Sequence, residues 1–174
     1  MGLKKSRIGI LAAVLVLGLF LMAGCSGKSS NEQMAEDMTK RVIKETTGKD
    51  VDVKMQGGKI EFKGQDFKSE IAETAAWPSD MFPEVPPFPF AKIERVSKGN
   101  EGGMQKFNIY YKDLKGDGIN QYAEMLKKNG WQTDIMQMGD KGGYLNAQKG
   151  KLGMNFGFSL ERKDGMLAVY TTPE

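Results

Sequence analysis

The strongest pattern in this sequence is a strict alternation of apolar residues over positions 152–160. In a β-strand, residues at every second position point to the same face of the sheet, so these residues are expected to be buried together. They are Leu152, Met154, Phe156, Phe158 and Leu160. A chain with this segment needs a sheet with one apolar face and a further layer packed on that face.

The positions between these apolar residues give the other face of the same strand a different character. They are Gly153, Asn155, Gly157 and Ser159. Small side chains let a helix approach a sheet closely, and this is the interpretation that we favour. Alternatively, they form the floor of a shallow groove with Tyr110, Tyr144 or Tyr170 at its rim. We therefore take this face as the candidate ligand site.

Residues 31–47 predict an amphipathic helix, and residues 51–63 predict a β-hairpin that turns at Gly57 and Gly58. The hairpin has one apolar face, on which we expect the apolar side of the helix to pack. Charged residues, among them Glu36 and Lys40, form the predicted solvent side of the helix. Its predicted inner side consists of Met34, Ala35, Met38, Val42 and Ile43.

Residues 77–90 contain five of the six prolines, together with several aromatic residues. This proline density excludes a helix and favours an extended or polyproline II backbone. We interpret the segment as a stiff connector lying on the sheet, with an exposed ligand for a partner's groove as the alternative.

The rest of the chain predicts two strands, one helix beginning near Asp117 as N-cap, and then about four strands. This ββα order followed by four strands indicates an α+β fold with a largely antiparallel sheet and one packed helix. The predicted divisions are a signal peptide (1–24), a tether (25–30), a helix–hairpin subdomain (31–76), a connector (77–90) and a main domain (91–174).

The first residues carry the features of a secretory signal. Basic residues at 4, 5 and 7 precede an apolar run over 8–22, and small residues then lead to Cys25. The sequence LMAGC at 21–25 resembles the lipobox of bacterial lipoproteins. That resemblance implies cleavage before Cys25, a diacylglyceryl thioether on its sulfur, and an anchored domain outside the cytoplasm, on either the cell membrane or an outer membrane. An ordinary secretory signal with an incidental cysteine is the alternative.

Charge and residue types exclude several classes of function. Residues 1–24 hold three basic and no acidic residues, so residues 25–174 carry 25 − 3 = 22 basic against 22 acidic residues. This zero net charge gives no support for nucleic-acid binding. Histidine is absent, so the Ser/His and Cys/His nucleophiles of many hydrolases are impossible. Cys25 is the sole cysteine, so no disulfide is expected within the chain.

Two metal sites are conceivable from residue types. Met136 and Met138, with Trp131 on the same predicted strand, would offer thioethers to Cu(I). Core filling is the simpler role for methionine. The residues that match positions of a calcium-binding EF-hand loop are Asp113, Asp117, Gly118 and Glu124. A strand-to-helix turn explains the same residues, and we predict no cofactor.

Three segments together resemble a group of uncharacterised bacterial lipoproteins and secreted proteins. They are TTGKDVDVKMQGGKIEFKG (46–64), WPSDMFPEVPPFPFAKI (77–93) and YAEMLKKNGW (122–131). The resemblance implies no activity and no site residues. We expect a non-enzymatic binding or interaction module of the envelope, with an envelope protein or a wall polymer as partner. The alternatives are a methionine-based copper carrier and a hydrolase without histidine.

Overall fold

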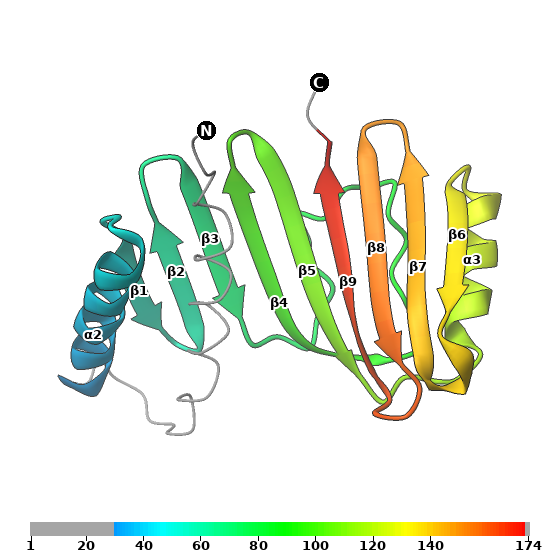
Figure 1. Cartoon of the computed structure of the whole chain (residues 1–174), viewed down its shortest axis with the longest axis horizontal. Coiled ribbons are helices and arrows are strands. Elements are labelled where there is room, and N and C mark those ends of the chain that lie inside the picture. The colour runs from blue at the N-terminus through cyan, green and yellow to red at the C-terminus, as the bar shows by residue number, and fades with distance from the viewer. Residues whose placement is uncertain (1–29, 173–174) are drawn as a thin grey trace, which may run out of the picture. The chain divides into compact units, whose positions relative to one another are not determined.

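The computed structural model describes residues 30–172. They form two compact units, and the boundary between the units in the sequence falls between Glu70 and Ile71. The first unit has a helix and three neighbouring strands in the order β1-β2-β3, and β3 contains the boundary (Figure 1). Its elements are α2 (Ser30–Thr47), β1 (Asp52–Gln56), β2 (Lys59–Lys63) and β3 (Phe67–Ala72).

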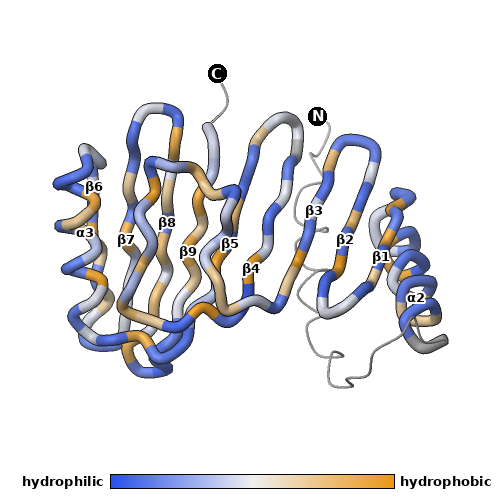
Figure 2. Tube along the Cα trace, turned by 180° about the vertical axis from the view of Figure 1, so that it is seen from behind, coloured by the Kyte–Doolittle hydropathy of each residue, from blue (hydrophilic) through white to orange (hydrophobic). Residues whose placement is uncertain are grey.

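The predicted hairpin of the first unit is confirmed by the antiparallel pairing of β1 with β2. Gly57 and Gly58, which join the strands, both have positive φ angles, of 56° and 76°, as a tight two-residue hairpin turn requires. Polar and apolar residues alternate along both strands (Figure 2). The buried residues are Val51, which lies just before the hairpin, and Val53, Met55, Ile60 and Phe62 within it.

The predicted inner side of α2 is wrong at three positions. Ile43 is buried as expected, but its buried neighbour on the helix is Thr39, while Met34, Met38 and Val42 are exposed. Polar contacts with β1 account for this rotation of the helix. Glu36 Oε1 accepts a hydrogen bond of 2.6 Å from the Met55 N–H, so a residue assigned to the solvent side faces the hairpin. On the same side of the helix, two ion pairs reach β1 and the loop before it, Lys40–Asp52 (3.3 Å) and Lys44–Asp50 (2.7 Å).

Strand β3 was not predicted. Its residues are mostly half-buried, so the segment lacks the alternation of buried and exposed positions that reveals β1 and β2. The turn before it is tight, since the Gly64 N–H donates a hydrogen bond of 2.9 Å to the Phe67 carbonyl. A strand with half-buried residues on both faces leaves no periodic signal in the sequence.

The second unit contains a six-stranded sheet in the order β4-β5-β9-β8-β7-β6, with antiparallel neighbours throughout. The predicted ββα order followed by four strands is confirmed, and so is the α+β class. The elements are β4 (Lys92–Glu101), β5 (Met104–Lys112), α3 (Gly118–Lys128), β6 (Gln132–Gln137), the short 3-10 helix η2 (Gly139–Lys141), β7 (Gly142–Lys149), β8 (Leu152–Ser159) and β9 (Asp164–Thr171).

Helix α3 packs on the apolar face of this sheet through Ile119, Tyr122 and Leu126. Asp117 occupies the predicted N-cap position, but its carboxylate makes no capping bond and instead accepts a hydrogen bond from the Gln121 side chain. The helix ends at Lys128 with Asn129 as its C-cap, and Gly130 has the positive φ angle expected of the residue that follows the cap.

The proline segment (residues 77–90) also lies on the apolar face of the sheet and contributes to the core of the second unit (Figure 1). Val85 and Phe88 are buried. The backbone is not a continuous polyproline II helix, because the Met81 N–H donates to the Pro78 carbonyl (3.2 Å) and the Val85 N–H donates to the Phe82 carbonyl (3.0 Å), which closes two turns. Two further hydrogen bonds fix the segment. The Trp131 indole N–H donates to the Glu84 carbonyl (3.2 Å), and the Tyr122 hydroxyl donates to the Pro86 carbonyl (2.8 Å).

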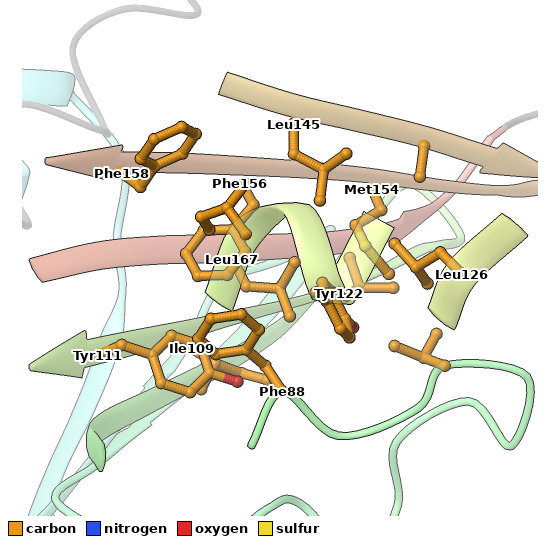
Figure 3. Packing of buried hydrophobic residues seen from close by; sticks show 14 of the residues in the cluster. Phe88, Ile109, Tyr111, Tyr122, Leu126, Leu145, Met154, Phe156, Phe158 and Leu167 are labelled. Carbon is orange, nitrogen blue, oxygen red and sulfur yellow. The ribbon is translucent and has the colours of Figure 1, made fainter. Parts of the chain in front are cut away.

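The Phe88 ring lies at the centre of the aromatic cluster in this core (Figure 3). Its centroid is 4.8 Å from that of Phe156, 5.1 Å from Tyr122 and 5.2 Å from Tyr111, with the rings steeply inclined to one another. Edge-to-face pairs of this kind stabilise a core beyond the effect of buried area alone. The cluster joins the proline segment, α3, β5 and β8.

Two buried tyrosines of this cluster provide a matched test of the core. Burial raises the pKa of both phenols, so both hydroxyls stay protonated in alkaline as well as neutral solution. The Tyr122 hydroxyl has its partner at Pro86, whereas the Tyr111 hydroxyl has no hydrogen-bond partner among the described residues.

We expect Tyr122→Phe to lower the free energy of unfolding by about 1 kcal/mol, because it removes a part-buried hydrogen bond and leaves the Pro86 carbonyl without this partner. Tyr111→Phe removes a hydroxyl that is already unpaired and should leave the free energy of unfolding unchanged or raise it. Denaturant unfolding of the two variants measures the difference. An equal loss in both would contradict this assignment of hydrogen bonds.

Candidate functional site

The predicted ligand residues lie on the face of the second unit's sheet opposite α3 and the proline segment. In the part of this unit that the structure describes, α3 packs on the other face, and no helix covers this one. We call it the open face. One row of directly paired residues crosses all six strands on it, consisting of Met136, Tyr144, Gly157, Met166, Tyr110 and Arg95.

The glycines of β8 serve the packing of tyrosine rings and not the packing of a helix, so the interpretation that we favoured is wrong. Tyr144 is paired directly with Gly157, and a Cβ atom placed on Gly157 would lie 3.3 Å from the Tyr144 ring. Tyr170 is paired directly with Gly153, where a Cβ would lie 2.5 Å from the ring. Each ring therefore lies over the backbone of β8, in space that another residue would fill.

Amide side chains lie between the two rings. Asn155 is midway between Gly153 and Gly157 on β8, and its Nδ2 donates a hydrogen bond of 2.5 Å to Asn146 Oδ1 on β7. Further along the same row, Asn108 Nδ2 donates to the Ser97 hydroxyl (3.1 Å). Paired amides of this kind retain free donor and acceptor positions toward solvent, because each amide has two donors and two lone pairs.

The open face is hollowed near both tyrosines. One hollow of about 560 Å³ is lined by Tyr144, Gly157 and Met166 among others. A second of about 370 Å³ is lined by Gly153, Tyr170 and Asn146 among others. Tyr144 itself is 43% exposed, so its ring is available to a ligand. The site is therefore long and shallow, with an aromatic ring beside each hollow.

Charged residues of both signs line the first hollow, and some of the charges around it form ion pairs. Arg162 Nε lies 2.9 Å from Asp164 Oδ2, and Lys112 Nζ lies 3.6 Å from Glu94 Oε1. The guanidinium of Arg95 lies 4.2 Å from the centroid of the Tyr110 ring, which leaves that ring less accessible than Tyr144. Such mixed and paired charges favour a neutral ligand over a polyanion.

Ser159, the fourth predicted ligand residue, lies at the end of β8. Its hydroxyl accepts a hydrogen bond of 3.2 Å from the Arg162 N–H and so helps to close the turn between β8 and β9. The sequence analysis considered Tyr144 and Tyr170 only in its alternative interpretation, as residues at the rim of a groove. The register that places Tyr144 and Tyr170 directly opposite glycines was the missing information.

The residues considered for copper do not lie together in the way that was predicted. Trp131 is buried on the core side, whereas Met136 points to the open face and is 58% exposed. Met138 lies just after the end of β6 and lines the first hollow together with Met166.

The residues considered for calcium have other partners. Asp113 Oδ2 lies 2.9 Å from Lys92 Nζ, and this hydrogen bond holds the pKa of that carboxyl below its usual range. Glu124 pairs with Lys127 at 2.8 Å, which lowers its pKa in the same way. Gly118 is needed for packing, since a Cβ there would overlap the side chain of Phe90. Within residues 30–172, no three acidic, histidine or cysteine residues are grouped to hold a metal.

The signal peptide (1–24), Cys25 and most of the predicted tether (25–30) lie outside the described residues. Among the helices that the structure describes, none is long and apolar enough to cross a membrane.

Two glycines on opposite faces of the sheet test whether the open face is uncovered. Gly165 faces the core, and a Cβ there would lie 2.7 Å from the Phe156 ring and 3.0 Å from the Gly157 carbonyl oxygen. We expect Gly165→Val to lower the free energy of unfolding by more than about 2 kcal/mol through overpacking.

Gly157→Val should displace only the Tyr144 ring and change the free energy of unfolding by less than about 1 kcal/mol, since valine favours strands. Thermal and denaturant unfolding of both variants provide the comparison. A large loss of stability in Gly157→Val would mean that another element packs on this face.

Comparison with known proteins adds nothing to the interpretation of this site, which rests on the geometry of the chain. Searches against known protein families, curated proteins and solved structures find no match for this sequence.

Proposed function

We propose that this protein is a lipid-anchored binding module of the bacterial envelope that holds a glycan strand on the open face of its second unit. The observation that carries the proposal is the pair of tyrosine rings that lie over Gly157 and Gly153, with the Asn146–Asn155 amide pair between them. This arrangement has the features of a platform for extended, neutral, polyhydroxylated chains.

The chemistry of a sugar ring matches the residues of this face. A pyranose has a face of C–H groups that packs on an aromatic ring, and a rim of hydroxyls that both donate and accept hydrogen bonds. Tyr144 offers the ring, and Asn146 and Asn155 offer groups that donate and accept. Each ring is held against a glycine, so little side-chain entropy is lost when a ligand packs on it.

The length of the platform favours a polymer over a single small molecule. Gly153 and Gly157 are four residues apart on one strand, so the two ring positions are separated by about 13 Å. Both hollows are partly open to solvent, whereas small-molecule sites usually enclose most of the ligand. An extended chain could therefore contact both rings and the amides between them.

The N-terminal sequence supports a location where such polymers occur. The lipobox at 21–25 resembles that of bacterial lipoproteins, which are anchored outside the cytoplasm. A wall glycan is thus the polymer that we propose as partner.

We expect Tyr144→Ala to weaken binding to purified wall glycan by about tenfold, which corresponds to about 1.4 kcal/mol. Tyr144→Phe keeps the ring and should bind nearly as well as the original protein. Co-sedimentation with insoluble wall material and calorimetry with soluble glycan fragments measure this. Equal binding by the alanine variant, with an unchanged fold, would reject the open face as the glycan site.

The anchoring part of the proposal has its own test. We expect Cys25→Ser to move the protein from the membrane fraction to the soluble or secreted fraction, because it removes the sulfur that carries the lipid. Ser26→Cys in the same background is a matched control, since it restores a thiol at a displaced position. Retention of the Cys25→Ser protein in membranes, processed as before, would show that the lipid is not the anchor.

A further inference from the structure

Helix α2 of the first unit carries an apolar stripe that the unit does not bury. Met34 is 63% exposed, Met38 is 62% exposed and Val42 is 47% exposed. These residues recur at intervals of four, so they lie on one side of the helix. The buried residues Thr39 and Ile43 lie on a different side, which packs on the hairpin.

The polar contacts of the helix hold this stripe outward. Glu36 bonds the Met55 N–H, and Lys40 and Lys44 form ion pairs with aspartates in and just before β1. Rotation of the helix to bury the methionines would break all three contacts. Single exposed apolar residues need no explanation, but a stripe of three on one side of a helix indicates a surface that is covered in use.

The length of chain before the helix limits what can cover the stripe. Cys25 precedes Ser30 by five residues, so a fully extended tether reaches about 17 Å. Met34 lies four residues into the helix, about 6 Å further along its axis. If Cys25 carries the lipid, α2 is held close to the bilayer surface, and no other partner is brought so near by the covalent structure.

We infer that α2 lies along the membrane surface with Met34, Met38 and Val42 inserted at the boundary between headgroups and acyl chains. This inference rests on the proposed lipid anchor at Cys25. The occupant is the bilayer, and the contact would set the orientation of the first unit on the membrane.

The charges of α2 indicate how the contact works. The helix has acidic residues at 32, 36, 37 and 45 and basic residues at 40, 41 and 44, a net charge of 3 − 4 = −1, so its net charge does not draw it to anionic lipid. Apolar burial is therefore the main attraction, and methionine side chains are flexible enough to fit an irregular lipid surface. Arg41 lies between Met38 and Val42 in the sequence and beside the stripe on the helix, so it can extend its charged end to the headgroups.

The test uses the lipidated full chain, reconstituted in vesicles of phosphatidylethanolamine and phosphatidylglycerol. Because Cys25 is a thioether in this form, a cysteine introduced elsewhere is the only free thiol. The variants are Met34→Cys and Met38→Cys, with Gln33→Cys as the matched control. Gln33 is exposed and adjacent to Met34, but it points about 100° away around the helix.

We expect a membrane-impermeant maleimide to label the two methionine positions at least tenfold more slowly than position 33. Similar labelling rates at all three positions, in protein that is firmly bound to the vesicles, would overturn this inference and leave the anchor intact. Protein that carries no lipid and does not stay with vesicles would overturn the anchor and the inference together. Protection that disappears when the protein is diluted with lipid would assign the stripe to a second copy and overturn the bilayer contact.

Discussion

The second unit depends on the contacts of the Phe88 ring. This ring comes from the proline segment and meets Phe156 of the central strand β8, Tyr111 of β5 and Tyr122 of α3. Prolines on either side of Phe88 restrict the backbone, so the ring is presented with little loss of chain entropy. The proline segment and α3 then share the work of covering one face of a six-stranded sheet that a single helix of eleven residues could not cover.

Because α3 and the proline segment both pack on one face of the sheet, the opposite face must be stabilised in another way. Glycine in the middle of a strand is unfavourable, since it has no side chain to pack. Here, Tyr144 and Tyr170 reach across from the neighbouring strands and fill the space over Gly157 and Gly153. The rings thus repair the sheet locally. The rings are also held in place before a ligand binds, so less side-chain entropy is lost on binding.

Alternating apolar residues identified β1, β2 and β8, and a turn at Asp164 and Gly165 helped to identify β9, whereas β3 was missed. Phe156 and its neighbours on β8 revealed a half-buried strand directly, whereas β3 has half-buried residues and left no such signal. The open face was identified from its small residues, but the register that places Tyr144 over Gly157 depends on strand pairing, which one sequence does not contain. Helix α2 shows a second limit. The stripes containing Met38 and Thr39 are adjacent on the helix, and hydrophobicity favours Met38, but long-range contacts of Glu36 and Lys40 bury Thr39.

A shallow platform gives modest affinity, because it excludes little water and offers few hydrogen bonds. With the proposed lipid anchor, a lower affinity of the open face for the polymer is sufficient. A tethered domain meets a wall polymer at a high effective concentration, since both are confined to the same thin layer, and a polymer presents many equivalent segments to many anchored copies. Weak individual contacts at Tyr144 can then give lasting attachment while each contact still exchanges quickly. An enclosed pocket would bind one chain end more tightly, but it would not accept the interior of a long strand. The open geometry of this sheet therefore suits a surface that holds a polymer along its length and releases it without a conformational change.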